Sequence, residues 1–306
     1  MSYSIIPNRR IVETNSKNMM KRVVSLFFIG LAIILSFGNC NSEEHRPSDS
    51  KEDDDKEVEY APFKVMSFNI RHDDDKDPLS LHERKDLILK EITQQNPEIV
   101  GLQEYSNNWF EDWMKIKMLD LGYQYYMDES ASKGSPKVIF YKEDRFEKRS
   151  FATFQMNFTE NRSGSWVILY DQENDLKYFV CNSHWTTVSS TERANTAGIV
   201  LEEIEQKHQG LPVIAFGDFN AKPHTREMLK MESHKVPAIT YADSTFAPTF
   251  HGWEDEGKSK IDWIFYSYDN LERIGFRVSN EKINGQWPSD HWAISAEFLP
   301  RKNVNE

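Results

Sequence analysis

Short, strongly apolar segments recur along residues 61–300, and stretches with the apolar spacing of helices lie between them. Several of these segments are apolar on successive residues, which is typical of strands whose sheet is covered on both faces. The pattern predicts packed sheets flanked by helices in one α/β domain, with no internal repeat and no interior linker. The segments with strand composition are Phe63–Ile70, Ile99–Gln103, Lys137–Tyr141, Trp166–Tyr170, Tyr178–Ser183, Val213–Phe216, Ile261–Tyr266 and Trp292–Phe298.

Two helices are predicted from apolar positions spaced three and four residues apart. The first has Leu87, Ile88 and Ile92 on one face and is ended by Pro97. The second begins at Ser190 or Thr191, either of which could cap it. Its apolar face is formed by Ala197, Val200, Leu201 and Ile204.

The first 40 residues have the layout of an export signal. Lys21 and Arg22 precede an apolar run over residues 23–37, and Cys40 follows closely. A positive region followed by about 15 apolar residues suits a secretory signal and is short for a membrane span. A cysteine at this place resembles a bacterial lipoprotein signal, in which the cysteine is lipidated and becomes the mature N-terminus; an uncleaved N-terminal anchor is the alternative.

Met19 and Met20 stand where such a signal begins, so either could be the true start. Residues 41–60 are rich in Ser, Asp, Glu and Lys, and this predicts a disordered acidic tether. Acidic residues after a lipidated cysteine also resemble surface-export signals, although a charged tether is the commoner explanation. We therefore expect residues 1–40 as a leader, 41–60 as a tether, 61–300 as the folded domain and 301–306 as a tail. We expect the protein to be located in the cell envelope, where lipid on Cys40 would anchor it to the outer membrane. It could also be exposed on the cell surface.

Polar residues able to bind a metal or move a proton follow the predicted strands at their C-terminal ends. Each taken singly is weak evidence, because Asn69 could cap a turn and His184 could be an ordinary strand-end histidine. Together they are strong evidence, because unrelated strand ends do not usually carry so many carboxylates, amides and imidazoles. The segments are Met66–Arg71, Gly101–Glu104, Cys181–His184, Gly217–Asn220, Lys260–Asp262 and Ser289–His291.

The chain resembles the endonuclease/exonuclease/phosphatase superfamily, because these segments occur in the same order as the motifs of that superfamily. The resemblance extends from Phe63 to Phe298. That superfamily includes deoxyribonuclease I, abasic-site endonucleases, inositol-phosphate 5-phosphatases and neutral sphingomyelinases. The resemblance is nearest to secreted bacterial members. It implies a four-layer α/β sandwich of two packed β-sheets flanked by helices, with the site at the rim of the two sheets.

The resemblance also implies roles for eight residues in a metal-dependent phosphoesterase. Glu104, with Asn69 and Asp290, would hold Mg²⁺ or Mn²⁺, which prefer carboxylate or amide oxygens. Asp218 and Asn220 would orient or deprotonate the attacking water. His291 would carry a proton or contact the phosphate, and Asp262 would fix the tautomer of His291. His184 would contact the phosphate or protonate the leaving group.

The sequence departs from the family on the leaving-group side. Many relatives carry a glutamate that supports the equivalent of His184, and Ser135 stands there in this chain. The leaving-group side is therefore the part of the site where a difference from the family is expected.

Charge and aromatic content bear on the substrate. Residues 61–306 hold 29 Lys and Arg against 39 Asp and Glu, a net charge of −10. A protein that grips a nucleic-acid duplex usually carries a basic patch, and Lys133, Lys137, Arg162 and Arg193 are scattered in the sequence. Most tryptophans are expected in the core, but Trp185 and Trp292 each follow a site histidine and could line the pocket.

We therefore expect a small phosphorylated or lipid-headgroup substrate and a monomeric enzyme. A nuclease of the same fold is the alternative. A non-catalytic surface-binding lipoprotein is a second alternative, from another class of function. Cys40 and Cys181 provide no disulfide framework.

Overall fold

The computed structural model describes residues 59–105, 108–128, 137–157, 160–232 and 237–302. The predicted leader with Cys40, most of the tether, and residues 303–306 lie outside these ranges, as does Ser135. Residues 57–306 form one compact unit by themselves. Among the residues described, none of the helices is both long and apolar enough to cross a membrane.

One six-stranded sheet, sheet A, is built from the first and last parts of the domain. Its strands lie in the order β11-β12-β1-β2-β4-β3. β1 runs parallel to β2 and antiparallel to β12, and the other neighbours are antiparallel. The bounds are β1 Phe63–Asn69, β2 Ile99–Gln103, β3 Tyr123–Tyr126, β4 Val138–Lys142, β11 Leu271–Val278 and β12 Ile294–Pro300.

The other six-stranded sheet, sheet B, comes from one continuous part of the chain between β4 and β11. Its strands lie in the order β5-β6-β7-β8-β10-β9. β7 and β8 are parallel, and the other neighbours are antiparallel. The bounds are β5 Phe146–Asn157, β6 Arg162–Asp171, β7 Leu176–His184, β8 Val213–Asp218, β9 Ile239–Tyr241 and β10 Asp262–Ser267.

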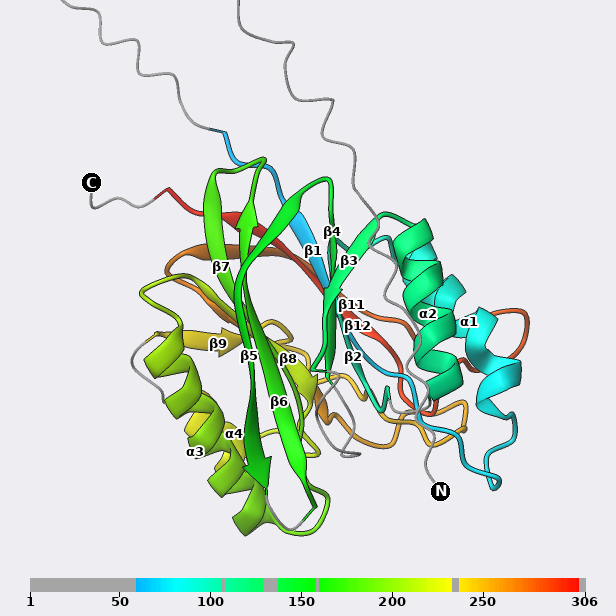
Figure 1. Cartoon of the computed structure of the whole chain (residues 1–306). Helices are drawn as coiled ribbons and strands as arrows, with labels where there is room; N and C mark the ends of the chain where they lie inside the picture. The colour runs from blue at the N-terminus through cyan, green and yellow to red at the C-terminus, as the bar shows by residue number, and fades with distance from the viewer. Residues whose placement is uncertain (1–58, 106–107, 129–136, 158–159, 233–236, 303–306) are drawn as a thin grey trace, which may run out of the picture. The chain divides into compact units, whose positions relative to one another are not determined.

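Three clusters of buried side chains produce four layers (Figure 1). The central cluster lies between the sheets, where Val65 and Ile99 of sheet A meet Val180 and Ile214 of sheet B. The second packs α1 (Leu81–Gln95) and α2 (Asn108–Asp120) on the outer face of sheet A. The third packs α3 (Ser190–Lys207) and α4 (Arg226–Glu232) on sheet B. The four-layer α/β sandwich expected from the sequence is confirmed.

The start of α3 differs from the predicted one because its capping residue lies one position earlier, whereas the start of α1 was not predicted. α1 is capped by Ser80, whose side chain accepts from the backbone of Glu83 while the Glu83 carboxylate accepts in return. α3 is capped by Ser189 through the backbone N–H of Glu192, and not by Ser190 or Thr191. An N-cap side chain satisfies backbone donors that the first helical turn leaves free.

Four strands and two helices were not predicted. β5 and β11 are edge strands, and β11 exposes charged and polar side chains, so it lacks the apolar run used as the signal. β3 and β9 have only four and three residues. α4 has seven residues, too few for an apolar period to be recognised.

Candidate active site

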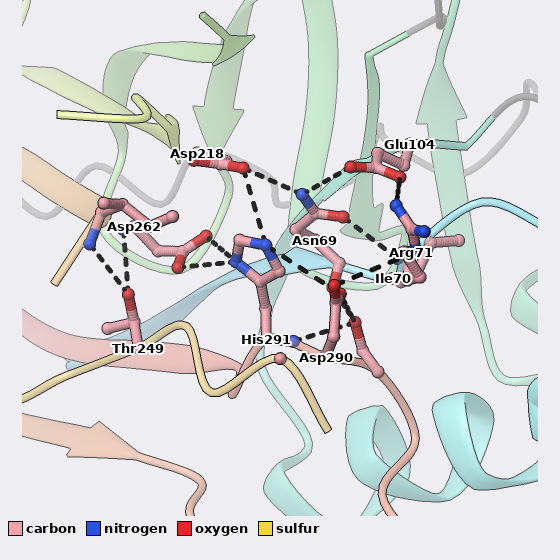
Figure 2. A network of polar contacts seen from close by, with 12 residues as sticks. Asn69, Ile70, Arg71, Glu104, Asp218, Thr249, Asp262, Asp290 and His291 are labelled. Carbon is pink, nitrogen blue, oxygen red and sulfur yellow. Dashed lines mark hydrogen bonds and ion pairs between the residues drawn. The ribbon is translucent and has the colours of Figure 1, made fainter. Parts of the chain in front are cut away.

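The ends of β1, β2 and β8 bring one amide and two carboxylates into contact. The Asn69 side-chain nitrogen donates to Glu104 Oε1 at 3.1 Å and to Asp218 Oδ2 at 2.9 Å (Figure 2). Asn69 and Glu104 belong to the strand ends of sheet A, and Asp218 ends β8 of sheet B. Asn69 therefore links the two sheets at their shared rim.

The orientation of Asn69 bears on its expected role as a metal ligand. Its amide oxygen accepts from the backbone N–H of Arg71 at 3.0 Å. Since a backbone N–H can only donate, this bond fixes which end of the amide faces the carboxylates. The nitrogen faces Glu104 and Asp218, so in this arrangement Asn69 holds two carboxylates in place and presents no oxygen beside them.

Three site residues lie one or two positions beyond a strand end in the left-handed backbone region. Arg71 has φ 56°, Glu104 has φ 60° and Asn220 has φ 49°. Residues other than glycine rarely adopt this conformation, and it is common at functional sites. These turns direct the chain back over the strand ends and so gather the site.

Asp262 and His291 form the pair that the sequence predicts. Asp262 Oδ2 lies 2.9 Å from His291 Nδ1 (Figure 2). The backbone of Asp262 is fixed by Thr249, whose hydroxyl accepts from its N–H at 3.0 Å. Ser289 anchors the histidine segment, because its hydroxyl donates to the Asn69 carbonyl at 2.6 Å and accepts from the His291 N–H at 3.2 Å. With Nδ1 directed at Asp262, Nε2 is the ring nitrogen directed at the site.

The charge around His291 favours the imidazolium. Burial alone would lower its pKa, but the carboxylates of Asp262, Asp218 and Asp290 raise the pKa to about 10. Its Nε2 lies 3.8 Å from Asp218 Oδ2. His291 is thus arranged as a cation at neutral pH, suited to contact a phosphate oxygen.

Asp218 occupies the centre of the rim. It pairs in register with Asp262 on β10 and with His184 on β7. Its Oδ1 accepts from the backbone of Asn220 at 2.9 Å. Burial and the neighbouring Asp262 charge raise the pKa of Asp218 to about 7 although His291 lowers it. A carboxylate that titrates near neutral pH is suited to accept a proton from water.

Asn220 is positioned by its side chain as well as by its backbone. Its amide nitrogen donates to the Trp185 carbonyl at 3.0 Å. This bond ties the turn after β8 to the end of β7. The amide oxygen is then the end of the side chain that remains to accept a bond.

His184 is buried, and its Nε2 lies 3.4 Å from Asp218 Oδ2. Among the described residues, its buried Nδ1 has no hydrogen-bond partner. Burial and the nearby charges of Lys137 and Arg162 hold the pKa of His184 well below its usual value. A neutral imidazole is a weak proton donor, so of its two expected roles the contact with phosphate is favoured over protonation of the leaving group.

Glu104 and Asp290 are the carboxylates of the site nearest to solvent, with side chains 15% and 12% exposed. Burial would raise the pKa of Glu104, but hydrogen bonds from the ring and backbone of His72 and the charge of that imidazole hold it well below its usual range. The Arg71 guanidinium spans both groups, with Nη1 4.0 Å from Glu104 Oε2 and Nε 3.9 Å from Asp290 Oδ2. Carboxylate oxygens are ligands that Mg²⁺ prefers, so these two groups are candidates to hold a divalent metal ion, in competition with the guanidinium.

A second group of possible metal ligands consists of Asp218, Asp262 and His291, whose ligand atoms all lie within 4.8 Å of one another. All three are buried. A metal bound to both Asp262 and His291 Nδ1 would replace the hydrogen bond that orients the ring. Binding at Glu104 and Asp290 leaves the Asp262–His291 pair intact, and these two carboxylates are less buried, so they are the better fit.

Arg84 is a site-supporting residue that was not predicted. Its fully buried guanidinium donates to the carbonyls of Ile70 at 2.8 Å and Pro288 at 2.9 Å, and also to those of Arg71 and His72. It thus joins the segment after β1 to the segment that carries Asp290. The sequence did contain a signal for this role, because Arg84 lies on the apolar face of α1, three residues after Leu81, where a charged side chain is buried.

Arg71 is a second residue with no predicted role. Its guanidinium is held by Asp77 at 2.9 Å and by Asp74 at 3.0 Å. Trp253 fixes Asp77 in turn, through a hydrogen bond of 3.1 Å from its indole N–H.

The expectation that Trp185 lines the pocket is wrong. Its side chain is fully buried, stacks on Phe219 with ring centroids 4.2 Å apart, and donates to Ser183 Oγ at 3.0 Å. The indole therefore packs in the core between sheet B and α3. Trp292 is also buried and stacks on His251 at 5.0 Å.

Comparison with known proteins identifies the family of this chain. A model of the endonuclease/exonuclease/phosphatase family matches residues 66–291, which include all eight predicted site residues. Human nocturnin is 25% identical over 288 residues, covering 78% of this chain and 65% of nocturnin, so the chain spans less than two thirds of that relative.

Two solved structures have the same fold. A Bacteroides vulgatus endonuclease/exonuclease/phosphatase superposes with a TM-score of 0.71 at 21% identity, covering 79% of this chain and 100% of the other. A mannosyl-6-phosphatase from Bacteroides thetaiotaomicron gives 0.68 at 20% identity, covering 77% and 99%. At these identities the likeness shows the fold alone. The family match extends over more than half of the chain, from β1 to His291. The chain belongs to the endonuclease/exonuclease/phosphatase family, whose members are hydrolases of phosphoester bonds.

Proposed function

We propose that this protein is a divalent-metal-dependent phosphoesterase that acts on a small phosphorylated or lipid-headgroup substrate. The observation that carries the proposal is the polar network joining Asp262, His291, Asp218 and Asn69 to Glu104 across the rim of both sheets (Figure 2). It combines an imidazolium, a carboxylate that titrates near neutral pH and Glu104, which with Asp290 is the least buried of the site's carboxylates.

The proposed role of each site residue follows from its position. Glu104 and Asp290 would hold Mg²⁺ or Mn²⁺, which supplies positive charge to the phosphate oxygens when bound. Asp218 accepts a proton from the attacking water, and the side-chain amide of Asn220 orients that water. His291, kept as a cation by Asp262, contacts a phosphate oxygen and stabilises charge that develops there. Neutral His184 donates a hydrogen bond to the phosphate.

A metal-dependent nuclease is the second candidate, and the names of some relatives favour it. The 5′-tyrosyl-DNA phosphodiesterase of Caenorhabditis elegans is 24% identical over 253 residues. A probable RNA exonuclease of Schizosaccharomyces pombe is 23% identical over 196 residues. The mannosyl-6-phosphatase fold relative acts, by its name, on a small sugar phosphate.

The test of the enzyme assignment is hydrolysis of bis(4-nitrophenyl) phosphate by the purified full chain. Activity should require Mg²⁺ or Mn²⁺ and stop with excess chelator. Asp218→Ala, Asp290→Ala and His291→Ala should each lose on the order of a hundredfold or more, as is typical when a positioned base or electrostatic group is removed. Asp112→Ala is the matched control, because Asp112 lies exposed on α2. Full activity in chelator, or near-normal rates in all three variants, contradicts the assignment and leaves a non-catalytic binding lipoprotein.

The anchor belongs to the same proposal. The order of Lys21 and Arg22, the apolar run over residues 23–37 and Cys40 supports lipidation at Cys40 and location in the cell envelope. Cys40→Ser should abolish labelling with a radioactive fatty acid and alter processing of the leader, while Cys181→Ser, in the buried core, should not affect labelling. Absence of label in the wild-type protein contradicts the anchor without affecting the hydrolase assignment.

A further inference from the structure

Trp253 has a backbone conformation that tryptophan rarely adopts. It lies in a turn in which the Glu254 N–H donates to the His251 carbonyl at 3.3 Å. Both central residues of this turn are left-handed, with φ 60° at Gly252 and φ 70° at Trp253. Turns of this kind favour Gly, Asn or Asp at their centre, and a bulky residue there is strained. Strained backbone is concentrated at functional sites, so the side chain at position 253 is a candidate for a functional role.

The turn that carries Trp253 is attached directly to the candidate active site. Its backbone N–H groups at positions 251 and 252 both donate to the Asp290 carbonyl at 3.0 Å. The Trp253 indole N–H donates to Asp77 Oδ1 at 3.1 Å, and Asp77 Oδ2 accepts from Arg71 Nε at 2.9 Å. That nitrogen of Arg71 lies 3.9 Å from Asp290 Oδ2. The indole is therefore located at the edge of the site, on the side of Asp290 and Arg71.

The two faces of the Trp253 ring have different surroundings. The buried Arg84 guanidinium lies over one face, 5.3 Å from the ring centroid. A cation over an indole is attracted to it and helps to hold the ring in place. Trp253 nevertheless remains partly exposed, whereas Trp287 and Trp292, which pack against His251, are buried. The ring surface that Arg84 leaves uncovered is thus available to a ligand.

Acidic side chains flank the Trp253 ring. Arg71 Nη2 donates to Asp74 at 3.0 Å and to Asp77 at 3.2 Å, so both carboxylates lie on the side of the indole N–H. The Asp74 side chain is 30% exposed, and Glu254, the next residue in the turn, is also exposed. A sugar ring has C–H groups that pack on an aromatic face and hydroxyl groups that donate to carboxylate oxygens. An aromatic surface beside such acceptors suits a sugar and disfavours a second anionic group.

We propose that Trp253 is a specificity-determining residue, whose indole binds the sugar ring of a hexose phosphate while the phosphate group lies at the candidate metal carboxylates and His291. This role rests on the proposed function and narrows its substrate class to phosphorylated sugars, but it concerns binding and can be tested without turnover. The alternative is that Trp253 is structural and only orients Arg71 through Asp77.

Two variants separate these roles. Trp253→Asn removes the aromatic ring and preserves the turn, because asparagine is among the residues that favour the left-handed region. Trp253→Phe retains an aromatic face and loses the N–H that binds Asp77. Trp109→Asn is the matched control, since Trp109 is an exposed tryptophan on α2 that lies against His82. Urea unfolding shows that each variant is folded before it is compared.

Binding is measured by calorimetry on the full chain at saturating Mg²⁺, with phosphonates, whose C–P bond is not hydrolysed. The ligands are the phosphonate analogues of glucose 6-phosphate, glycerol 3-phosphate and adenosine 5′-monophosphate. They carry the same kind of anionic group on a hexose, on an acyclic polyol and on a nucleoside. Hydrolysis of glucose 6-phosphate is measured separately.

The wild type and Trp109→Asn should bind the glucose analogue about tenfold more tightly than the glycerol analogue, as is typical of one aromatic contact. Trp253→Asn should lose about tenfold in affinity for the glucose analogue and much less for the glycerol analogue. Trp253→Phe should bind both ligands nearly as the wild type does.

Equal losses for both ligands, no loss, or a Trp253→Phe variant as weak as Trp253→Asn overturns the proposal. Tighter binding of the adenosine analogue, or no binding of the glucose analogue by the wild type, also overturns it. If binding behaves as expected but glucose 6-phosphate is not hydrolysed, the proposed function fails and the sugar-binding role of Trp253 stands.

Discussion

Asp218 shows how position alone gives an ordinary carboxyl group a useful chemistry. It is 2% exposed, it faces Asp262 across the β8–β10 ladder, and it receives an N–H from Asn220. Burial and the like charge of Asp262 favour its protonated form, whereas the hydrogen bond and the His291 charge favour the ionised form. The balance places its pKa at about 7.

The pH dependence of hydrolysis should follow from this value. A base works only when ionised, so kcat/KM should fall as the pH decreases through the pKa of Asp218. The midpoint should lie no higher than pH 7, because a divalent cation bound nearby lowers the pKa further. Profiles of kcat/KM from pH 5 to 9 at saturating metal are the measurement. The residual activity of Asp218→Asn should lack this rise, and an unchanged profile in that variant would show that another group is the base.

Residues with fixed chemical roles were predictable from the sequence, while supporting residues were not. Asp262 and His291 are brought together as expected, because their types and order already suggest the pair. Arg71 and Arg84 were given no role, because an arginine in a loop or helix is usually a solvated charge and only the fold shows what it contacts. The direction of the Asn69 amide was equally hidden, since it depends on the Arg71 backbone.

Between β7 and β8 the strand pairing requires a residue without a side chain. Gly217 has φ 148°, and a Cβ added there would lie 1.8 Å from the Ser183 carbonyl oxygen. Gly217 pairs with Ser183 just before the pair of Asp218 with His184. The close approach of the two backbones at Gly217 therefore sets the spacing of two site residues.

Gly217→Ala should separate the ends of β7 and β8. The contact is with backbone, which cannot swing away, so we expect a loss of about 3 kcal/mol in the free energy of unfolding and a large loss of hydrolysis. Gly122→Ala is the control: it also has positive φ, at 78°, but a Cβ there meets no atom within 4 Å. Urea unfolding of both variants measures the difference, and equal losses would mean that φ alone, not the close approach, requires glycine at position 217.

Central elements were predicted well because burial on both faces leaves an uninterrupted apolar run. β2 and β8 are buried at every position and were predicted nearly to the residue. β11 has one buried residue among eight, and its place at the sheet edge comes from pairing with β12, a long-range contact with no local signal.

Over the part of the domain that the structure describes, the basic residues noted in the sequence do not provide a path for a nucleic-acid duplex. Lys137 is buried, and Arg193 pairs with Glu227 at 2.9 Å. Arg162 is mostly buried, 3.7 Å from Glu160, and Lys133 lies outside the described residues. With a net charge of −10 over residues 61–306, the domain repels a polyanion at long range.

The substrate comparison follows from this charge. At one fixed salt concentration, kcat/KM for small phosphoesters such as sugar phosphates should exceed that for plasmid DNA. Raising the salt concentration should reduce the difference between the two values of kcat/KM, because screening weakens the repulsion between the domain and the polyanion. A clear preference for plasmid at physiological salt would favour the nuclease and leave the metal-dependent hydrolase assignment in place.

The division of sheet A between the two ends of the domain has a consequence for how the protein is made. β12 lies between β1 and β11 in this sheet, and Asp290 and His291 directly precede it, whereas sheet B is complete by Ser267. During synthesis, which runs from the N-terminus, β1 lacks one of its two neighbours until residue 300 has left the ribosome. An unfinished chain thus lacks a complete sheet A and an assembled rim. A chain that is still on the ribosome is therefore expected to lack the assembled rim, and with it the proposed activity, until its last strand is available.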